Sequence, residues 1–283
     1  MDDSKLVLTG STPCDQLMKS ILYLPSDELI DFMKWELTLT GNVDKTFTLN
    51  LNYGESQPNT SGFKQGGKNI SYSGKYDAVL SDSEKLHGMI YSLRSDDNSG
   101  ILIRMIKVNE NIFHLLTNDD RLFIGNGGWS YTLNRKTPLQ PGTLPVLTDL
   151  EYVLSDTTVR SVFDGRTPCS PIASEYNFPA SGDCFKIKWR LTLLRDPATH
   201  LPGEYTLQNI FAGDRIAKGT WDISVGTPLS PGVVIYRLDP GKPEKSLSFL
   251  AAERNVLYFL DRNDQIFTGN SDFSFTLNRI PVK

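Results

Sequence analysis

The residue types that carry out catalysis or bind metals are scattered along this chain of 283 residues. The histidines, His87, His114 and His200, lie in three separate parts of the sequence, without a recognisable serine or cysteine partner for nucleophilic catalysis. The three cysteines form no Cys-x-x-Cys pair and show no zinc-like spacing with histidine. We therefore expect no catalytic residues, no metal site and no cofactor.

Two groups of large side chains are candidates for lining a pocket. The first group consists of aromatic residues expected on inward faces: Trp35, Tyr76, Trp189 and Trp221. The second consists of Arg135 and Arg279, each of which ends the apolar face of a predicted strand. An inward arginine needs a carboxylate, backbone carbonyls, an aromatic ring or a bound anion. Two roles stay open for these arginines: a structural stack that closes one end of a barrel, or a contact to an anionic ligand.

These candidates recur because the chain is a tandem duplication. Gly125–Arg135, with the sequence GNGGWSYTLNR, returns 144 positions later as Gly269–Arg279, with the sequence GNSDFSFTLNR. Lys34–Leu39 matches Lys188–Leu193 in the same order along the chain. Within each copy of the longest motif, large residues alternate with Ser, Thr and Asn, which is the period-two pattern of a strand.

The strand pattern predicts an all-β fold. Several short runs with one apolar face are separated by turn residues such as Gly41-Asn42. We expect two tandem small antiparallel β-barrels of the lipocalin-like type, because closure removes exposed strand edges. Gly125–Arg135 and Gly269–Arg279 are then the closing strands, with Trp129 and Tyr131 pointing into the first interior.

A short helix is expected near the start of each barrel. Thr12-Pro13 would begin the first helix and Ser170-Pro171 the second, since Ser and Thr cap helices and proline suits the first helical position. The prolines of Pro138–Pro145 predict a stiff linker. Leu150–Leu154 is a candidate short strand that either opens the second half or fills the joint between the halves. The expected domains are a first barrel at residues 1–137, a Pro-rich linker at 138–154 and a second barrel at 155–283.

Composition excludes some partners. A charge of −4 without basic clusters argues against nucleic acid, and no apolar run of about eighteen residues predicts a transmembrane segment. The N-terminal Met-Asp-Asp-Ser-Lys lacks the basic and apolar parts of a signal peptide. On this observation a cytoplasmic location stays open.

Five motifs of the second half occur in a recognisable order: Gly165–Cys169, Cys184–Leu193, Gly219–Trp221, Leu238–Pro240 and Gly269–Arg279. Together they resemble the copper-resistance NlpE-like proteins common in Bacteroidetes, which are related to the N-terminal domain of the outer-membrane lipoprotein NlpE. The resemblance covers most of the second half and, more weakly, the first. It implies a lipocalin-like barrel in the cell envelope or periplasm, often tethered to a membrane as a lipoprotein.

The sequence departs from that family at its best-known feature. The Leu-Pro-Cys-x-x-Cys motif is incomplete, because Cys169 is followed by Ser170-Pro171-Ile172 and Cys14 by Asp15-Gln16-Leu17. The copper role is therefore not carried over to this chain. No lipobox cysteine is present to predict lipidation.

Cys169 and Cys184 are a candidate disulfide pair. They stand at the start of the expected second helix and of the strand that carries Trp189, and a helix folded over the barrel mouth would bring them into range. The alternative is two buried thiols. The first half has Cys14 but Ile30 at the second position, so it has no counterpart of this bridge.

The duplicated barrel pattern and the lack of catalytic groups favour a non-catalytic protein, and the family resemblance implies a place in the cell envelope. Its expected role is to bind a small apolar or amphipathic ligand or to sense an envelope component, such as an envelope protein. A structural or interaction module made of two fixed barrels is the alternative. An enzyme that acts inside a barrel, with Arg135 or Arg279 holding an acidic substrate, is a third hypothesis.

Overall fold

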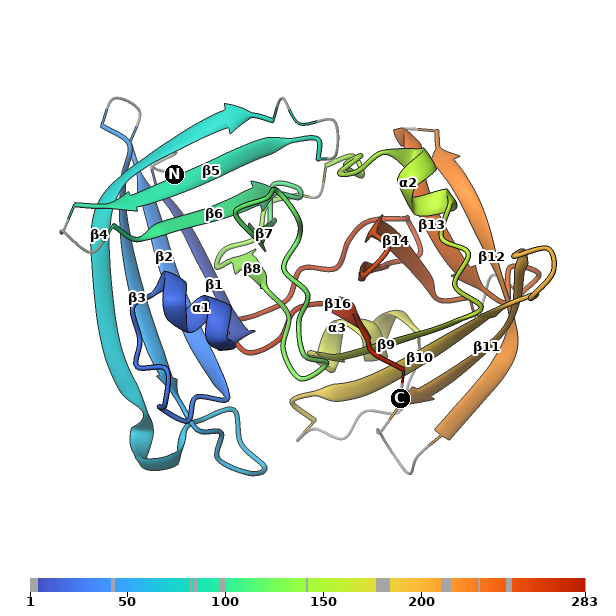
Figure 1. Ribbon diagram of the computed structural model, residues 1–283. Coiled ribbons are helices and arrows are strands. Elements are labelled where there is room, and N and C mark those ends of the chain that lie inside the picture. The colour runs from blue at the N-terminus through green and yellow to red at the C-terminus, as the bar shows by residue number, and fades with distance from the viewer. Residues whose placement is uncertain are drawn as a thin grey trace.

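The chain folds into two closed eight-stranded antiparallel barrels that lie side by side (Figure 1). This computed structural model describes residues 5–41, 44–81, 83, 86–96, 100–140, 142–176, 184–209, 215–228, 230–242 and 246–282. In both barrels each strand pairs with the next in sequence, and the last pairs with the first, so the topology is up-and-down. The predicted all-β fold of two tandem barrels is confirmed.

The strands of the first barrel are β1 Lys5–Pro13, β2 Phe32–Thr40, β3 Thr46–Gly54, β4 Lys68–Leu80, β5 Met89–Ser95, β6 Leu102–Lys107, β7 Ile112–Leu116 and β8 Thr132–Arg135. Those of the second are β9 Arg160–Thr167, β10 Ile187–Arg195, β11 Pro202–Asn209, β12 Arg215–Thr227, β13 Ser230–Leu238, β14 Ser248–Glu253, β15 Val256–Leu260 and β16 Thr276–Ile280. The strands β8 and β16 close the barrels against β1 and β9. The motifs that recur in the same order in both halves therefore correspond to the same succession of strands in each barrel.

Three α-helices and one short 3-10 helix complete the described chain. The helices are α1 Gln16–Ile21, α2 Leu150–Leu154 and α3 Ser170–Glu175, and the 3-10 turn is Lys64–Gly66. As predicted, a short helix lies near the start of each barrel. In both barrels it follows a first strand that was not predicted. The predicted start of α1 is wrong: Thr12 and Pro13 end β1, and the Asp15 carboxylate caps the helix by accepting a hydrogen bond from the Met18 amide.

The linker holds a helix where we expected a strand. Asp149 is the N-cap of α2, and its carboxylate accepts from the Glu151 amide at 3.0 Å. This capping overrides the apolar run that suggested a strand at Leu150–Leu154. In the second barrel, the cap of α3 is Cys169 and Ser170-Pro171 form its first turn, one residue earlier than predicted.

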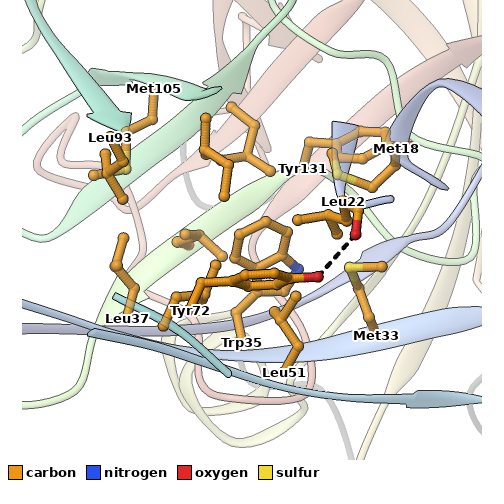
Figure 2. Packing of buried hydrophobic residues seen from close by; sticks show 14 of the residues in the cluster. Met18, Leu22, Met33, Trp35, Leu37, Leu51, Tyr72, Leu93, Met105 and Tyr131 are labelled. Carbon is orange, nitrogen blue, oxygen red and sulfur yellow. Dashed lines mark hydrogen bonds between the residues drawn. The ribbon is translucent and has the colours of Figure 1, made fainter. Parts of the chain in front are cut away.

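Side chains fill the interior of the first barrel. Strands and helix α1 contribute to one buried cluster, in which Met18 of the helix and Leu22, its C-cap, pack against Met33 and Trp35 (Figure 2). The Tyr72 hydroxyl donates to the Leu22 carbonyl at 2.8 Å, which ties the end of α1 to the barrel wall. Helix α1 is thus a plug for one end of the barrel.

Candidate functional site

The two predicted interior tryptophans have matching structural roles. Trp35 and Trp189 are almost fully buried, and their indole N–H groups donate to the hydroxyls of Thr12 and Thr167 at 2.8 and 2.9 Å. Both threonines are completely buried. Each pair cross-links the first two strands of its barrel, so these polar atoms are already satisfied within the protein.

The end of the second barrel that holds Trp221 is closed by two arginines. The Arg195 guanidinium lies 4.9 Å from the centre of the Trp221 ring. Arg279 donates to Asp156 Oδ2 at 2.9 Å and to the Ser161 hydroxyl at 2.8 Å. The hollow left at this end measures only about 10 Å³, room for at most one water molecule.

Electrostatic pairing keeps this barrel end closed. Burial works to raise the pKa of Asp156, but hydrogen bonds from Thr158 and the Arg279 charge outweigh it, so that the pKa lies below its usual value. The partner of Arg279 is therefore a carboxylate of this chain. At this barrel end the arginine that stacks on tryptophan is Arg195, which was not among the predicted residues.

The corresponding residues of the first barrel are arranged differently. The rings of Tyr76 and Tyr91 lie 6.0 Å apart and are half-buried, and burial raises the pKa of both phenols. Arg135 reaches the Glu110 carbonyl at 3.5 Å. The six predicted pocket residues thus lie in two barrels and do not converge on one site.

A disulfide joins Cys169 to Cys184, with their Cα atoms 5.9 Å apart. It fastens the start of α3 to the segment that leads into β10. In the first barrel Cys14 is a free, buried thiol, and burial raises its pKa to about 12. In the first barrel a hydrogen bond takes the place of the disulfide: the Tyr131 hydroxyl donates to the Asp15 carboxylate at 2.8 Å and so holds the start of α1.

The polar faces of the closing strands meet each other between the barrels. Ser130 Oγ lies 2.6 Å from Ser274 Oγ, and Thr132 Oγ1 lies 3.0 Å from Thr276 Oγ1. All four residues are buried. Each contact joins a residue to its own duplicate, which is the pattern of a two-fold symmetric interface.

Two asparagines extend this pattern by exchanging equivalent hydrogen bonds. Asn134 accepts from the Gly269 amide at 2.8 Å, and Asn278 accepts from the Gly125 amide at 2.7 Å. Both asparagines are almost fully buried. Each barrel therefore holds the glycine turn of the other.

His114 and its duplicate Tyr258 also contact each other at this interface. The Tyr258 hydroxyl lies 2.8 Å from His114 Nδ1, and Nε2 lies 2.8 Å from the Phe123 carbonyl oxygen. Because a carbonyl only accepts, Nε2 carries the proton and Nδ1 is an acceptor, with the hydroxyl oxygens of Tyr258 and Thr132 at 2.8 and 3.0 Å from it. Burial lowers the pKa of His114 to about 4, which keeps the ring neutral at physiological pH.

An apolar core surrounds the polar contacts between the barrels. It is a buried cluster separate from both barrel interiors, and it unites Ile106 and Ile112 of the first half with Ile235 and Leu250 of the second. Leu144 and Leu147 of the linker belong to the same cluster. The linker is therefore part of the interface and packs against both barrels.

Hollows of a few hundred cubic ångströms lie outside the barrel interiors, and three of them are lined by described residues. One of about 330 Å³ lies between the barrels beside Thr148, Tyr152 and Glu253, and one of about 410 Å³ lies beside Tyr176 and Arg237. The third, of about 290 Å³, lies where Gly127 of the first barrel meets β9 and β10 of the second.

The closing strands depart from the prediction at Trp129. Tyr131 and Leu133 belong to the interior cluster as expected, but Trp129 stacks on Phe32 with ring centres 4.4 Å apart and carries the Arg166 guanidinium 4.8 Å from its own ring centre. The reason is that β8 begins only at Thr132, so the strand alternation does not extend back to Trp129. Trp129 is a contact between the two halves.

Comparisons with known proteins yield no match to this chain among family models, curated proteins or solved structures. Over the described ranges, no three or more His, Cys, Asp or Glu side chains are grouped so that they could hold a metal ion. Among the same residues, no helix is long and apolar enough to span a membrane.

Proposed function

We propose that this chain is a non-catalytic interaction protein whose two barrels act as one rigid body. The observation that carries the proposal is the buried, reciprocal interface made by Ser130, Thr132 and Asn134 with their duplicates. A small barrel whose interior is filled by its own side chains has room for a partner only on its outer surface. Two barrels in a fixed arrangement together form a composite surface.

The linker region supports this proposal with exposed apolar side chains. Leu139, Tyr152, Leu154 and Val159 are 38–42 % exposed in a segment that otherwise packs on both barrels. Exposed apolar surface is a common feature of protein interaction sites. The face that carries α2 is therefore the favoured contact region for a partner.

A matched pair of variants tests the proposal. Thr132→Lys places an ammonium group at a buried interface position, whereas Thr48→Lys places it on the exposed face of β3. Partners are crosslinked in the native host and identified by mass spectrometry. We expect the wild type and Thr48→Lys to retain the same partner, crosslinked to residues 139–159, and Thr132→Lys to lose it. Equal retention by Thr132→Lys, or no partner at all, contradicts the proposal.

Binding of a small apolar or amphipathic ligand inside a barrel is the alternative function. Native mass spectrometry of protein from its own host distinguishes the two. The interaction proposal predicts the mass of the polypeptide alone, while a retained small molecule supports the alternative.

We also propose that the protein works in the cell envelope. The Cys169–Cys184 disulfide supports an oxidising compartment, since disulfides persist there and are rare in the cytosol. The resemblance to NlpE-like proteins points to the same location. Fractionation of the native host tests this proposal, and recovery in the cytosol with reduced cysteines contradicts it.

A further inference from the structure

The hollow of about 290 Å³ at the junction of the barrels is rich in positive charge. Arg166, Lys188 and Arg190 of the second barrel line it, beside Gly127 of the first. Asp164 is the carboxylate in its lining, and it is bound by Arg190 through two hydrogen bonds of 2.9 and 2.7 Å. Among the residues that the structure describes, no carboxylate forms such an ion pair with Arg166 or Lys188.

Arg166 is the half-buried cation of this group. It stacks on Trp129, and within the described part of the chain it forms no ion pair within 4.0 Å. Burial lowers the pKa of the Arg166 guanidinium. The neighbouring Lys186 has a pKa lowered by burial and then by the charges of Arg166 and Lys188, so these cations repel one another.

At the equivalent position of the first barrel, a carboxylate of the protein itself is present. Ser11 and Lys34 are paired across β1 and β2 as Arg166 and Lys188 are paired across β9 and β10. There Asp272, from the turn of the second barrel, accepts from Lys34 Nζ at 2.6 Å. Internal pairing therefore neutralises the lysine in one of the two equivalent places.

The residue equivalent to Asp272 at the other place is Gly128. The two turns share the same asparagine hydrogen bonds: Asn126 accepts from the amides of Gly128 and Trp129 at 2.9 and 3.0 Å, and Asn270 accepts from those of Asp272 and Phe273 at 2.9 Å. They differ at the preceding residue, where Gly127 has a positive φ of 77° and Ser271 does not. A Cβ atom built on Gly128 would lie 3.5 Å from Arg166 Cζ. The carboxylate is thus missing at a position whose amide makes the same turn hydrogen bond as that of Asp272.

We propose that the Arg166–Lys188 hollow binds the carboxylate group of another molecule, in the place that Asp272 fills in the duplicate. An arginine provides two parallel N–H donors for a carboxylate, and the lysine adds a second charge. The carboxylate belongs either to a small organic acid or to an acidic side chain of a peptide. The proposal is independent of the interaction role proposed above.

Titration at low salt with citrate, with a blocked aspartate-containing peptide and with inorganic phosphate tests the proposal. Binding is followed by tryptophan fluorescence, because Trp129 stacks on Arg166, and by the NMR amide signals of Gly127 and Gly128. We expect saturable shifts with a carboxylate probe, and the tighter of citrate and peptide identifies the source. No saturable shift, or a phosphate affinity equal to that of the carboxylates, overturns the proposal.

Three variants locate the binding. Gly128→Asp supplies an internal carboxylate, Gly128→Asn is its matched uncharged control, and Arg166→Gln removes the main donor. We expect Gly128→Asp and Arg166→Gln to raise the dissociation constant at least about tenfold, which corresponds to about 1.4 kcal/mol, and Gly128→Asn to leave it within about threefold. Unchanged thermal melting shows that each variant is folded. Equal binding by Gly128→Asp and Gly128→Asn overturns the proposal.

Discussion

The hydroxyl oxygens of Ser130 and Ser274, which are 144 positions apart in the chain, lie 2.6 Å from each other in the buried centre of the molecule. The contacts around this pair are reciprocal: Asn134 holds the Gly269 amide and Asn278 holds the Gly125 amide. Residue-to-duplicate contacts of this kind define an isologous interface in homodimers. The protein is, in its contacts, a symmetric dimer fused into one chain.

The Ser130–Ser274 contact leaves no room for a larger side chain. Ser274→Leu is expected to lower the free energy of unfolding by about 1–3 kcal/mol, because it overpacks the interface and leaves the Ser130 hydroxyl unpaired. Urea denaturation measures the change. Ser73→Leu, on an exposed position of β4, is the control and is expected to stay within about 0.5 kcal/mol of the wild type. Equal effects of the two substitutions would contradict this assignment.

The asparagine exchange predicts a second loss of stability. Asn134→Ala removes the acceptor of the Gly269 amide and is expected to cost about 1–3 kcal/mol, since the amide is left without its partner. Asn50→Ala on the exposed face of β3 is the matched control. Thermal and urea unfolding of both variants give the comparison, and a cost for Asn134→Ala no larger than that of the control would be inconsistent with the role of the interface.

His114 makes stability depend on pH. Its pKa is about 4 in the folded protein and 6.5 in the reference state, so the unfolded chain takes up the proton first. The contribution of neutral His114 is complete above pH 6.5, is lost as the pH falls toward 4, and changes no further below 4. The difference of about 2.5 pKa units corresponds to at most about 3 kcal/mol.

Comparison with His114→Gln isolates this effect from the titrating carboxylates. The free energy of unfolding is measured by urea denaturation between pH 4 and pH 7. The wild type is expected to lose more stability on acidification than the variant. Parallel curves would show that His114 does not titrate as described.

The cysteines predict a defined labelling pattern. Alkylation of the unfolded protein without reductant is expected to label one cysteine, Cys14, and alkylation after reduction to label three. The bridge closes a separation of 15 residues, so Cys169→Ala is expected to lower stability by about 3 kcal/mol. Mass spectrometry and denaturation provide the two measurements, and three labels without reductant would refute the bridge.

The sequence pattern predicted the duplication, the barrels and their closing strands because these depend on local alternation and spacing. It missed the opening strands, Lys5–Pro13 and Arg160–Thr167. The end of β1 consists of residue types that are common in turns, namely Gly10, Ser11, Thr12 and Pro13. The last six positions of β1 are all buried, so buried and exposed residues do not alternate there. Burial on both strand faces arises from contacts with the other barrel, which local patterning does not report.

The candidate site was predictable only in part. Arg195 follows Trp189, Leu191 and Leu193 at period two, the same signal that pointed to Arg135 and Arg279, so it was accessible from sequence. The partner of Arg279 was not, because Asp156 lies 123 positions away and is brought close only by the linker helix. The polar face of Ser130, Thr132 and Asn134 was recognised as polar, but its burial depends on docking of the second barrel.

The fusion of the two halves has a genetic consequence for Gly128 and Asp272. In a dimer of identical chains one codon specifies both equivalent positions, so a carboxylate gained at one junction is gained at the other. Here each junction has its own codon. A mutation can therefore convert one junction into a receptor for outside molecules while the other keeps its internal ion pair.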